Sequence, residues 1–274
     1  MQLQSFSIGA HSTWNWCPEF NFMIDCGEGA VTHLGINSVT PLKFIFLTHD
    51  HMDHVAGLIN LLHLRTRVAG LEPIKVFYPH DSGRLHAFDR MLRYQRTSHE
   101  LIALGPMDRV HIATDGGAPL VMQAFPVNHG KAWASGYKLI HERRKLRQEF
   151  HGKPGNELAR LKLEDPYDDL CDPNPFHILT YTGDTQPIDP ERLGRPKTLI
   201  HDATYPTAGM VEDHEHSTLD DARAAAAATG ARLIVNHLSL RYRDFPPLVA
   251  RDSTSSQPGF NFVPPINRVT TFEL

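Results

Sequence analysis

The stretch Phe44-Ile-Phe-Leu-Thr-His49-Asp50-His51-Met52-Asp53-His54 decides the interpretation of this 274-residue chain. It opens on an apolar, β-rich run at Phe44–Leu47, which predicts a buried strand. It is followed by Val55–Arg67, whose apolar residues recur on one helical face and predict a helix. The loop between these elements holds four side chains that can bind a metal within six residues: His49, His51, Asp53 and His54.

This loop predicts a metal site with more than one ion. Imidazole and carboxylate ligands together suit zinc or a similar divalent ion. A single catalytic zinc takes three protein ligands and keeps one position open, so four ligands from one loop favour two ions. Burying that many polar groups without a metal would be costly.

Three further polar residues follow expected strands downstream. His129 comes after Leu120–Pro126, Asp184 after His177–Tyr181, and His237 after Arg232–Val235. Taken alone, each would be interpreted as a turn or capping residue. Their recurrence at strand ends makes them candidates for the remaining ligands of a two-metal site.

The rest of the chain predicts a layered α/β architecture in one domain spanning residues 1–274. Leu219–Thr229 is the clearest helix, because Thr218 and Asp221 form a capping-box pattern and Gly230 supplies a stop. Asp252–Gly259 is expected to be a mobile loop. Further strands are expected at Gln2–Ile8, Phe20–Asp25, Ile74–Tyr78, Thr198–His201 and near Arg268–Phe272.

The composition excludes several classes of protein. Hydrophobic residues make up 41% and charged residues 21%, which excludes a disordered or fibrous chain. A net charge of −4 excludes a globally basic nucleic-acid coat. Cys17, Cys26 and Cys171 have no paired spacing, so reduced packing thiols are expected. Neither a secretory signal nor a long apolar span is recognisable, so we expect a cytoplasmic location and no membrane partner.

One segment departs from the acidic average. Lys138–Lys153 carries six basic and two acidic residues, a net charge of +4, and the acidic run Glu164–Asp172 follows it. A charge run is ordinarily a solvated face. On an acidic protein it is also a candidate handle for a polyanion. The candidate contacts are Arg143, Arg144, Lys145 and Arg147.

The pattern His49-x-His51-x-Asp53-His54, followed by His129, Asp184 and His237, resembles the metallo-β-lactamase superfamily. The resemblance implies an αββα sandwich with a dinuclear site along one edge. It also implies how the ligands divide. His49, His51 and His129 would bind one ion, and Asp53, His54 and His237 the other, with Asp184 bridging them.

Three motifs narrow the resemblance to the ribonuclease Z family, in its short form. They are His201-Asp202-Ala-Thr-Tyr205, His216-Ser217-Thr218 and His237-Leu-Ser239-Leu-Arg241-Tyr242, with Asp25-Cys-Gly-Glu-Gly29 upstream. The chain departs from the family in having Asp202 where Glu is usual, and in lacking a recognisable Gly/Pro-rich arm. A small basic arm at residues 138–175 is expected as an insertion that serves as the exosite.

The family resemblance implies an endoribonuclease that removes 3′ trailers from precursor tRNA with two zinc ions per subunit; manganese is the alternative metal. Asp53 would orient the attacking water, and His216, held by Asp202, would act as general acid. Ser239 and Arg241 are candidate phosphate ligands, although Arg241 is equally interpretable as a surface ion-pair residue. The resemblance also implies a homodimer.

Two alternatives remain open at this point. One is another hydrolase of the same superfamily, acting on a small phosphodiester, a thioester or a lactam. The other is a non-catalytic RNA-binding subunit, which would be expected to have lost ligands, whereas all seven are present. The sequence leaves open the cleavage position relative to a CCA end, the native metal and the way the arm captures tRNA.

Overall fold

The computed structural model describes residues 1–80, 82–130, 132–165, 169–242, 261–262 and 268–274. The loop expected at Asp252–Gly259 lies outside these described residues. Two seven-stranded sheets form the body of the molecule. In sheet order, the first contains β16 (Thr270–Glu273), β1 (Gln2–Ile8), β2 (Ser12–Cys17), β3 (Phe22–Ile24), β4 (Phe44–Phe46), β5 (Ile74–Pro79) and β6 (His99–Leu104). The second contains β15 (Asn261–Phe262), β14 (Arg232–Asn236), β13 (Thr198–Asp202), β12 (Phe176–Tyr181), β9 (Ala132–His141), β8 (Ala118–His129) and β7 (Arg109–Asp115).

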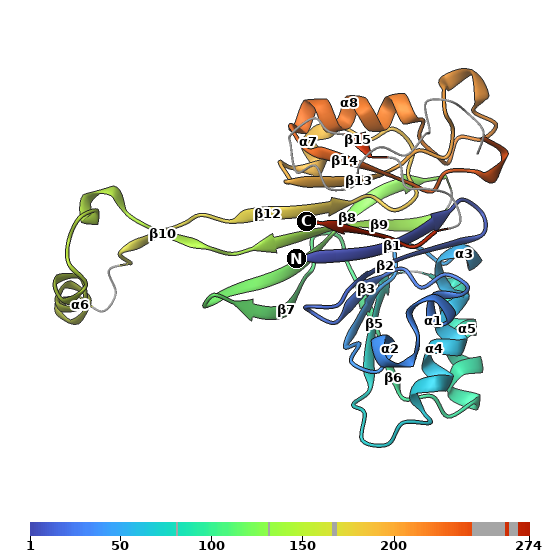
Figure 1. The fold of residues 1–274 in the computed structure, drawn as a ribbon, viewed down its shortest axis with the longest axis horizontal. Helices are drawn as coiled ribbons and strands as arrows, with labels where there is room; N and C mark the ends of the chain where they lie inside the picture. Colours follow the sequence, from blue (N-terminus) through green and yellow to red (C-terminus); the bar gives the residue numbers. More distant parts are fainter. Residues whose placement is uncertain (81, 131, 166–168, 243–260, 263–267) are drawn as a thin grey trace.

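The two sheets pack face to face, and helices cover their outer faces (Figure 1). A buried cluster that includes Phe46, Tyr137 and Tyr181 fills the space between the sheets. Two further clusters bury the outer faces under the helices. The first sheet is covered by α1 (Ala30–Leu34), α2 (Ile36–Val39), α3 (Met52–Val55), α4 (Gly57–Arg65) and α5 (Gly83–Tyr94), and the second by α7 (Pro190–Leu193) and α8 (Leu219–Thr229). This arrangement is the expected αββα sandwich.

The local signals around α8 act as predicted. The Thr218 side chain accepts the N–H of Asp221, the Asp221 carboxylate accepts the N–H of Thr218, and the helix ends at Gly230 in the left-handed conformation. The predicted bounds of this helix and of β1 agree with the structure. Both elements have strong local cues, which explains why the sequence predicts them well.

The single helix predicted over Val55–Arg67 is two helices in the structure. α3 ends at Val55 and α4 begins at Gly57. The chain bends at this point because the Gly57 backbone lies against the loop after β3, where it donates to the carbonyl of Cys26 at 2.8 Å. A Cβ at residue 57 would lie 2.1 Å from the carbonyl oxygen of Gly27, so only glycine fits this approach. The contact joins the metal-binding loop to the loop that begins at Asp25.

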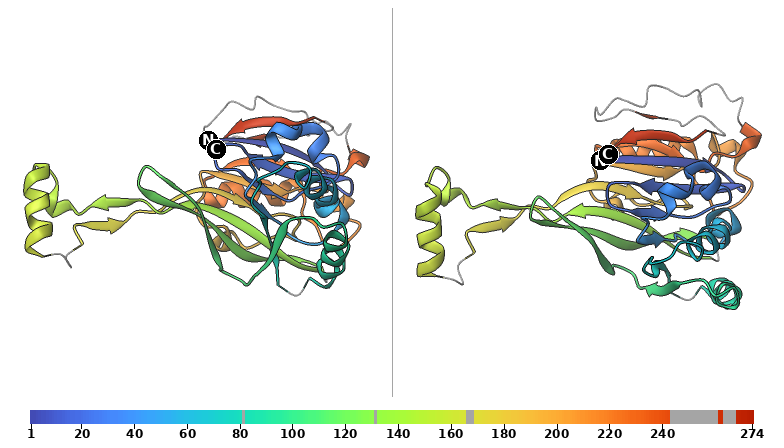
Figure 2. Two further views of the ribbon diagram at one scale, coloured as in Figure 1. Left: turned by 90° about the horizontal axis from the view of Figure 1, so that it is seen from below. Right: turned by 60° about the horizontal axis from the view of Figure 1, so that its bottom comes forward.

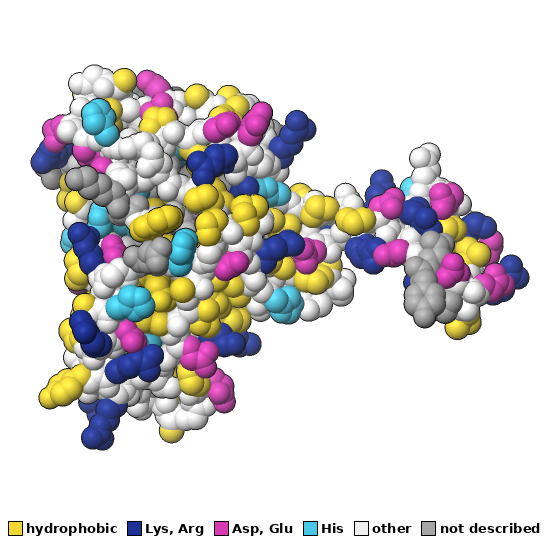
Figure 3. All heavy atoms as spheres, turned by 180° about the vertical axis from the view of Figure 1, so that it is seen from behind, with side chains coloured by type: hydrophobic (Ala, Val, Ile, Leu, Met, Phe, Trp, Pro, Cys, Tyr) yellow, Lys and Arg dark blue, Asp and Glu magenta, His cyan; other side chains and the backbone are white. Residues whose placement is uncertain are grey.

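The segment 142–175, described over residues 142–165 and 169–175, projects from the body between β9 and β12 (Figure 1; Figure 2). The projection consists of the short ladder of β10 (Arg144–Leu146) and β11 (Cys171–Pro173), the 3₁₀ turn η1 (Gln148–Phe150) and the helix α6 (Gly155–Glu164) at its end. Its sequence holds seven Lys or Arg and eight Asp or Glu, and Figure 3 shows the two charge types intermixed on it. The +4 segment of the sequence is therefore offset by acidic neighbours in space.

In the described part of the chain, no helix combines the length and the apolar character that a bilayer span requires. Cys17, Cys26 and Cys171 are free thiols, and burial raises the pKa of Cys17 to about 12. The expectation of unpaired packing thiols is confirmed for Cys17 and Cys26, which are buried.

Candidate metal centre

The loop between β4 and α3 delivers its ligands from two directions. The strand β4 ends at Phe46, and Leu47 still donates to the carbonyl of Phe77 at 2.8 Å, so His49 leaves the sheet in a fixed position. His51 is the N-cap residue of α3, and Asp53 and His54 lie within that short helix. The rings of His49 and His54 are fully buried, whereas 12% of the Asp53 side chain is exposed.

The structure brings all seven predicted ligands together in two groups. Ligand atoms of the first group, His49, His51 and His129, lie within 4.8 Å of one another. The same limit holds for the second group: Asp53, His54, Asp184 and His237. Asp184 lies between the groups, since its Oδ2 is 3.7 Å from His49 Nε2, 3.3 Å from His54 Nε2 and 3.2 Å from His237 Nε2.

Polar atoms without a hydrogen bond at the centre fit divalent metal ions. His49 Nε2, His54 Nε2 and Asp184 Oδ1 are buried and make no hydrogen bond in the described structure. Buried side-chain nitrogen and oxygen atoms are nearly always hydrogen-bonded, so three such atoms within one cluster of ligands require an explanation. The donor set of imidazoles and carboxylates is the one that zinc and similar ions take.

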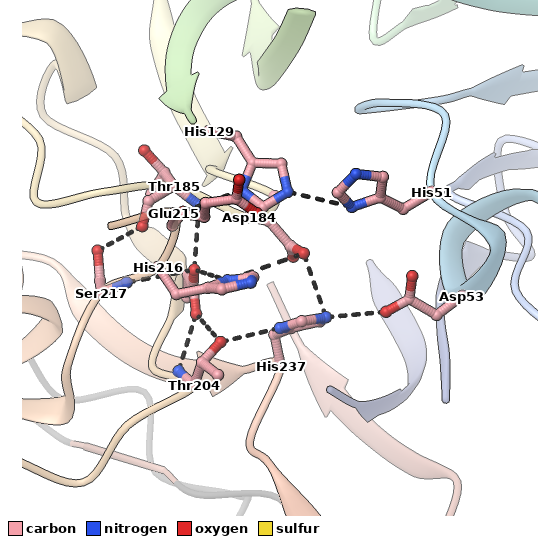
Figure 4. A network of polar contacts seen from close by, with 12 residues as sticks. His51, Asp53, His129, Asp184, Thr185, Thr204, Glu215, His216, Ser217 and His237 are labelled. Atoms are coloured by element: carbon pink, nitrogen blue, oxygen red, sulfur yellow. Dashed lines mark hydrogen bonds and ion pairs between the residues drawn. The ribbon is translucent and has the colours of Figure 1, made fainter. Parts of the chain in front are cut away.

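Hydrogen bonds to Nδ1 orient four of the five histidines. His49 and His237 face the hydroxyls of Thr48 and Thr204 at 3.0 and 2.9 Å. His54 faces the carboxylate of Asp25 at 2.9 Å, and His129 faces the carbonyl of Glu215 at 2.9 Å. Such partners turn Nε2 toward the metal and fix the tautomer. His51 differs, because its Nδ1 points inward and lies 3.2 Å from His129 Nε2 (Figure 4).

Asp25 is a functional residue that the sequence reasoning did not select. It is fully buried and, besides His54, its carboxylate accepts bonds from the backbone and hydroxyl of Thr48 and from the hydroxyl of Tyr181. Asp25 therefore supports the ligands His49, through Thr48, and His54. The sequence signal for Asp25 is the Asp25-Cys-Gly-Glu-Gly29 motif, which forms part of the family resemblance.

His216 and Asp202 form an ion pair beside the metal-binding groups. His216 Nδ1 is 2.9 Å from Asp202 Oδ2, so the shorter Asp side chain still reaches the ring. Burial of His216 opposes its charged form, but the carboxylate of Asp202 outweighs burial and raises the pKa of His216 to about 9. The ring stacks on that of His237, with centroids 5.0 Å apart. The imidazole of His216 is thus held next to the candidate metal centre by the carboxylate of Asp202 (Figure 4).

Two carboxylates at the centre, Asp202 of this pair and Asp53, have further partners. Asp202 also accepts the backbone N–H groups of Thr185 and Thr204, which fix its orientation. Asp53 lies 3.0 Å from His237 Nε2. Burial opposes the charged form of Asp53, yet the bond with His237 and nearby histidine charge lower the pKa of this carboxyl to about 2. Asp53 is therefore an ionised, partly exposed carboxylate at the mouth of the centre.

The predicted substrate contacts do not gather at the centre. Arg241 is exposed and forms an ion pair with Glu212, which is the surface interpretation that the sequence left open. Ser239 lies on the segment that follows His237, where its backbone bridges to Gly9. Arg143, Arg144, Lys145 and Arg147 lie on the projection. Arg144 pairs with Asp169, and Arg147 lies 3.5 Å from Glu149.

The comparisons with known proteins agree with this fold. Residues 20–149 match the model of a β-lactamase superfamily domain. The chain is 28% identical to ribonuclease Z of Methanosarcina mazei, over 81% of this chain and 79% of that protein. It is 29% identical to ribonuclease Z of Natronomonas pharaonis, over 88% and 85% of the two chains.

Solved structures give the same architecture. The crystal structure of the short form of human tRNase Z superposes with a TM-score of 0.67 at 18% identity and covers 100% of both chains. A diphosphatase of the PhnP family superposes with a TM-score of 0.62 at 15% identity and covers 99% of this chain and 98% of that one. The protein has the metallo-β-lactamase fold, and its residues 20–149 match a β-lactamase superfamily domain. The curated relatives that it resembles over most of its length are ribonuclease Z proteins, which agrees with the family resemblance seen in the sequence.

Proposed function

We propose that the protein is a metal-dependent endoribonuclease that removes 3′ trailers from precursor tRNA. The observation that carries the proposal is the His216–Asp202 pair, which holds a proton donor beside a cluster of seven metal-binding side chains. Cleavage of RNA expels a 3′-oxygen that leaves poorly as an alkoxide, and a proton donor beside the metal-binding cluster can protonate it as it departs. The ribonuclease Z relatives support the choice of tRNA as the substrate.

The chain's own residues divide the chemistry between them. When bound, two divalent ions would supply Lewis-acid stabilisation of the phosphodiester and lower the pKa of a water molecule. Asp53, ionised and partly exposed, orients that water for in-line attack at phosphorus. His216 gives its proton to the departing 3′-oxygen, and Asp202 holds the ring in the orientation needed for that transfer.

Several finer points belong to the same proposal. We propose zinc as the native metal, because imidazoles dominate the donor set, with manganese as the alternative. The projection at residues 142–175 would hold the tRNA backbone, and Ser239 and Arg241 would contact phosphate. The active form would be a homodimer, whose mass light scattering measures directly.

Cleavage of a 3′-extended precursor tRNA by the purified zinc-loaded protein tests the proposed activity. We expect a single cut at the 3′ side of the acceptor stem, and precursors with and without CCA map its position. His216→Ala is expected to lower the rate by roughly 10²–10⁴-fold, the contribution of a general acid, with unchanged zinc content. The proposal is wrong if the zinc- or manganese-loaded protein leaves the precursor uncut, and the role of His216 is wrong if the variant cuts at the normal rate.

A second candidate function is hydrolysis of a small phosphodiester by the same centre. The balanced charge of the projection favours this function, because such a projection attracts a polyanion less strongly than the sequence suggested. Replacing Arg143, Lys145 and Arg147 by Gln distinguishes the two functions. Loss of tRNA cleavage with unchanged hydrolysis of bis(p-nitrophenyl) phosphate supports the ribonuclease, whereas a wild-type protein that hydrolyses bis(p-nitrophenyl) phosphate but leaves precursor tRNA uncut favours the second candidate.

A further inference from the structure

One turn, at residues 213–216, connects the two halves of the proposed chemistry. It lies in the loop between β13 and α8. The carbonyl of Glu215 faces Nδ1 of the candidate metal ligand His129 at 2.9 Å. The next residue is His216, whose ring is bonded to Asp202 (Figure 4). A small change in this turn would therefore move a metal ligand and the proposed acid together.

Asp213 holds the turn from within. One of its carboxylate oxygens, Oδ1, accepts the backbone N–H of Glu215 at 2.9 Å. The other, Oδ2, accepts the hydroxyl of Tyr205 at 2.6 Å. Glu215 is thereby bonded at both ends, through its N–H to Asp213 and through its carbonyl to His129.

Tyr205 provides a rigid base for this contact. The residue is only 5% exposed. Its backbone N–H donates to the carbonyl of Ser217 at 3.3 Å, and its carbonyl accepts the N–H of Leu219 at 2.8 Å, at the first residue of α8. On the other side of the turn, Gln186 donates to the carbonyl of His214 and accepts the side-chain amide of Asn128 at 2.7 Å. The turn is thus tied to the frame of the second sheet on both sides.

We propose that Tyr205 and Asp213 form a clamp that positions both the metal ligand His129 and the proton donor His216 through the turn that joins them. Neither residue of the clamp touches the reacting atoms, so both are positioning residues. The part that concerns His216 rests on the proposed function, and the part that concerns His129 requires only that the centre binds metal. Partners that orient metal-ligating histidines typically contribute 10- to 100-fold to metal affinity or activity.

The test uses single-atom and single-side-chain changes. Tyr205→Phe removes only the hydroxyl, and Asp213→Ala removes both bonds of the carboxylate. Asp213→Asn keeps an oxygen for the Glu215 N–H and serves as the conservative rescue. Tyr242→Phe is the matched control, because this neighbouring hydroxyl donates to the Met210 carbonyl at 3.3 Å and not to the turn.

Zinc affinity is measured without substrate, by competition with a chromogenic chelator. The values of kcat and KM are measured with a 3′-extended precursor tRNA, because its leaving 3′-oxygen depends on the proton donor. We expect Asp213→Ala to weaken zinc binding about 10-fold or more and to lower kcat, with KM little changed. Tyr205→Phe should act in the same direction and Asp213→Asn should recover part of the loss. Adding Tyr205→Phe to Asp213→Ala should cost nothing further, because the two act through one contact. Tyr242→Phe should match the wild type.

The clamp is refuted if Tyr205→Phe and Asp213→Ala keep zinc affinity and kcat within twofold of the wild type. It is equally refuted if thermal unfolding shows lower stability while zinc affinity and kcat stay unchanged, because the contact would then be merely structural. Should Asp213→Ala fail to fold, Tyr205→Phe decides the matter alone. A wild-type protein that binds zinc but leaves precursor tRNA uncut would overturn the proposed function, and the zinc measurements would still decide the clamp.

Discussion

At the residue scale, the centre depends on buried groups that never meet the substrate. Asp25 is the clearest case, because its carboxylate is hydrogen-bonded to the N–H and hydroxyl of Thr48, to the hydroxyl of Tyr181 and to the ring of His54. Burial of a carboxylate costs desolvation free energy, and its hydrogen bonds offset that cost only if all the partners stay in place. Asp25 therefore fixes Thr48, which contacts His49, and the ring of His54, and so orients the metal-facing nitrogens of both histidines.

We predict that Asp25→Asn weakens zinc binding by roughly 10- to 100-fold, because the amide cannot accept all the bonds of the carboxylate and His54 loses its orienting partner. Chelator competition measures the effect. Asp108→Asn is the control, since this carboxylate lies at an exposed turn and, within the described residues, accepts a hydrogen bond from the Gly105 N–H alone. An Asp25→Asn protein that binds zinc as tightly as the Asp108→Asn protein would contradict the assigned role.

His177 gives a pH dependence that is separate from the metal centre. Its burial, with a smaller effect from the charge of Lys138, lowers the pKa of His177 to about 4. The unfolded chain, with an ordinary histidine pKa near 6.5, binds a proton at higher pH than the folded chain does. Stability contributed by neutral His177 is therefore present above about pH 6.5 and is lost as the pH falls toward 4.

We predict that His177→Gln reduces the loss of unfolding free energy between pH 7 and pH 5 by on the order of 1–2 kcal/mol relative to the wild type. Urea unfolding at the two pH values, with the variant and the wild type in parallel, measures this difference. The same pH dependence in both proteins would mean that His177 is protonated without penalty in the fold.

At the element scale, the sequence predicts best where local signals decide the structure. The helix α8 has its own cap and stop, and β4 and the ligand loop have an apolar run followed by a dense polar motif. By contrast, the sequence does not predict α5. Only Leu85 and Leu92 of this helix are buried, so its apolar periodicity is weak. The long hairpin of β8 and β9 depends on pairing between strands, which no local pattern specifies.

The same limit applies to the site. Ligand identities follow from residue types, but the links from Thr48 to Asp25 and from Glu215 to His129 join residues 23 and 86 positions apart. Such contacts depend on tertiary packing. For the basic segment Lys138–Lys153, the sequence overestimates the net charge, because a count of +4 along the chain leaves out the neighbours in space. Lys138 lies on β9 in the body, over the ring of Phe125. Arg144, Arg147 and Lys153 lie beside the carboxylates of Asp169, Glu149 and Glu157.

The break between α3 and α4 gives an element-scale prediction. Gly57→Ala would place a Cβ 2.1 Å from the carbonyl of Gly27, and the rigid backbone on both sides prevents relief. We expect a loss of about 1–3 kcal/mol in unfolding free energy, with weaker zinc binding because the two loops separate. Gly83→Ala is the matched control at the start of α5, since a Cβ there meets no atom within 4 Å. Equal stability of the two variants would show that the loops can move apart at no cost.

At the scale of the whole molecule, the projection and the body pack independently of each other. No described residue of α6 is buried, whereas the body holds three buried apolar clusters. The strands that carry the projection, β9 and β12, are already neighbours in the sheet, with Phe176 paired to His141. The chain could therefore pass from one strand to the other without residues 142–175.

We predict that replacing residues 142–175 by a two-residue Asn-Gly turn leaves a folded, zinc-binding body, because this turn suits a hairpin between paired antiparallel strands. Hydrolysis of bis(p-nitrophenyl) phosphate should stay within a few-fold of the wild type, since no predicted ligand lies in the deleted segment. Cleavage of precursor tRNA should fall by a much larger factor through KM. Retained tRNA cleavage would show that the body alone captures the RNA, and loss of both activities with zinc still bound would show that the projection also shapes the centre.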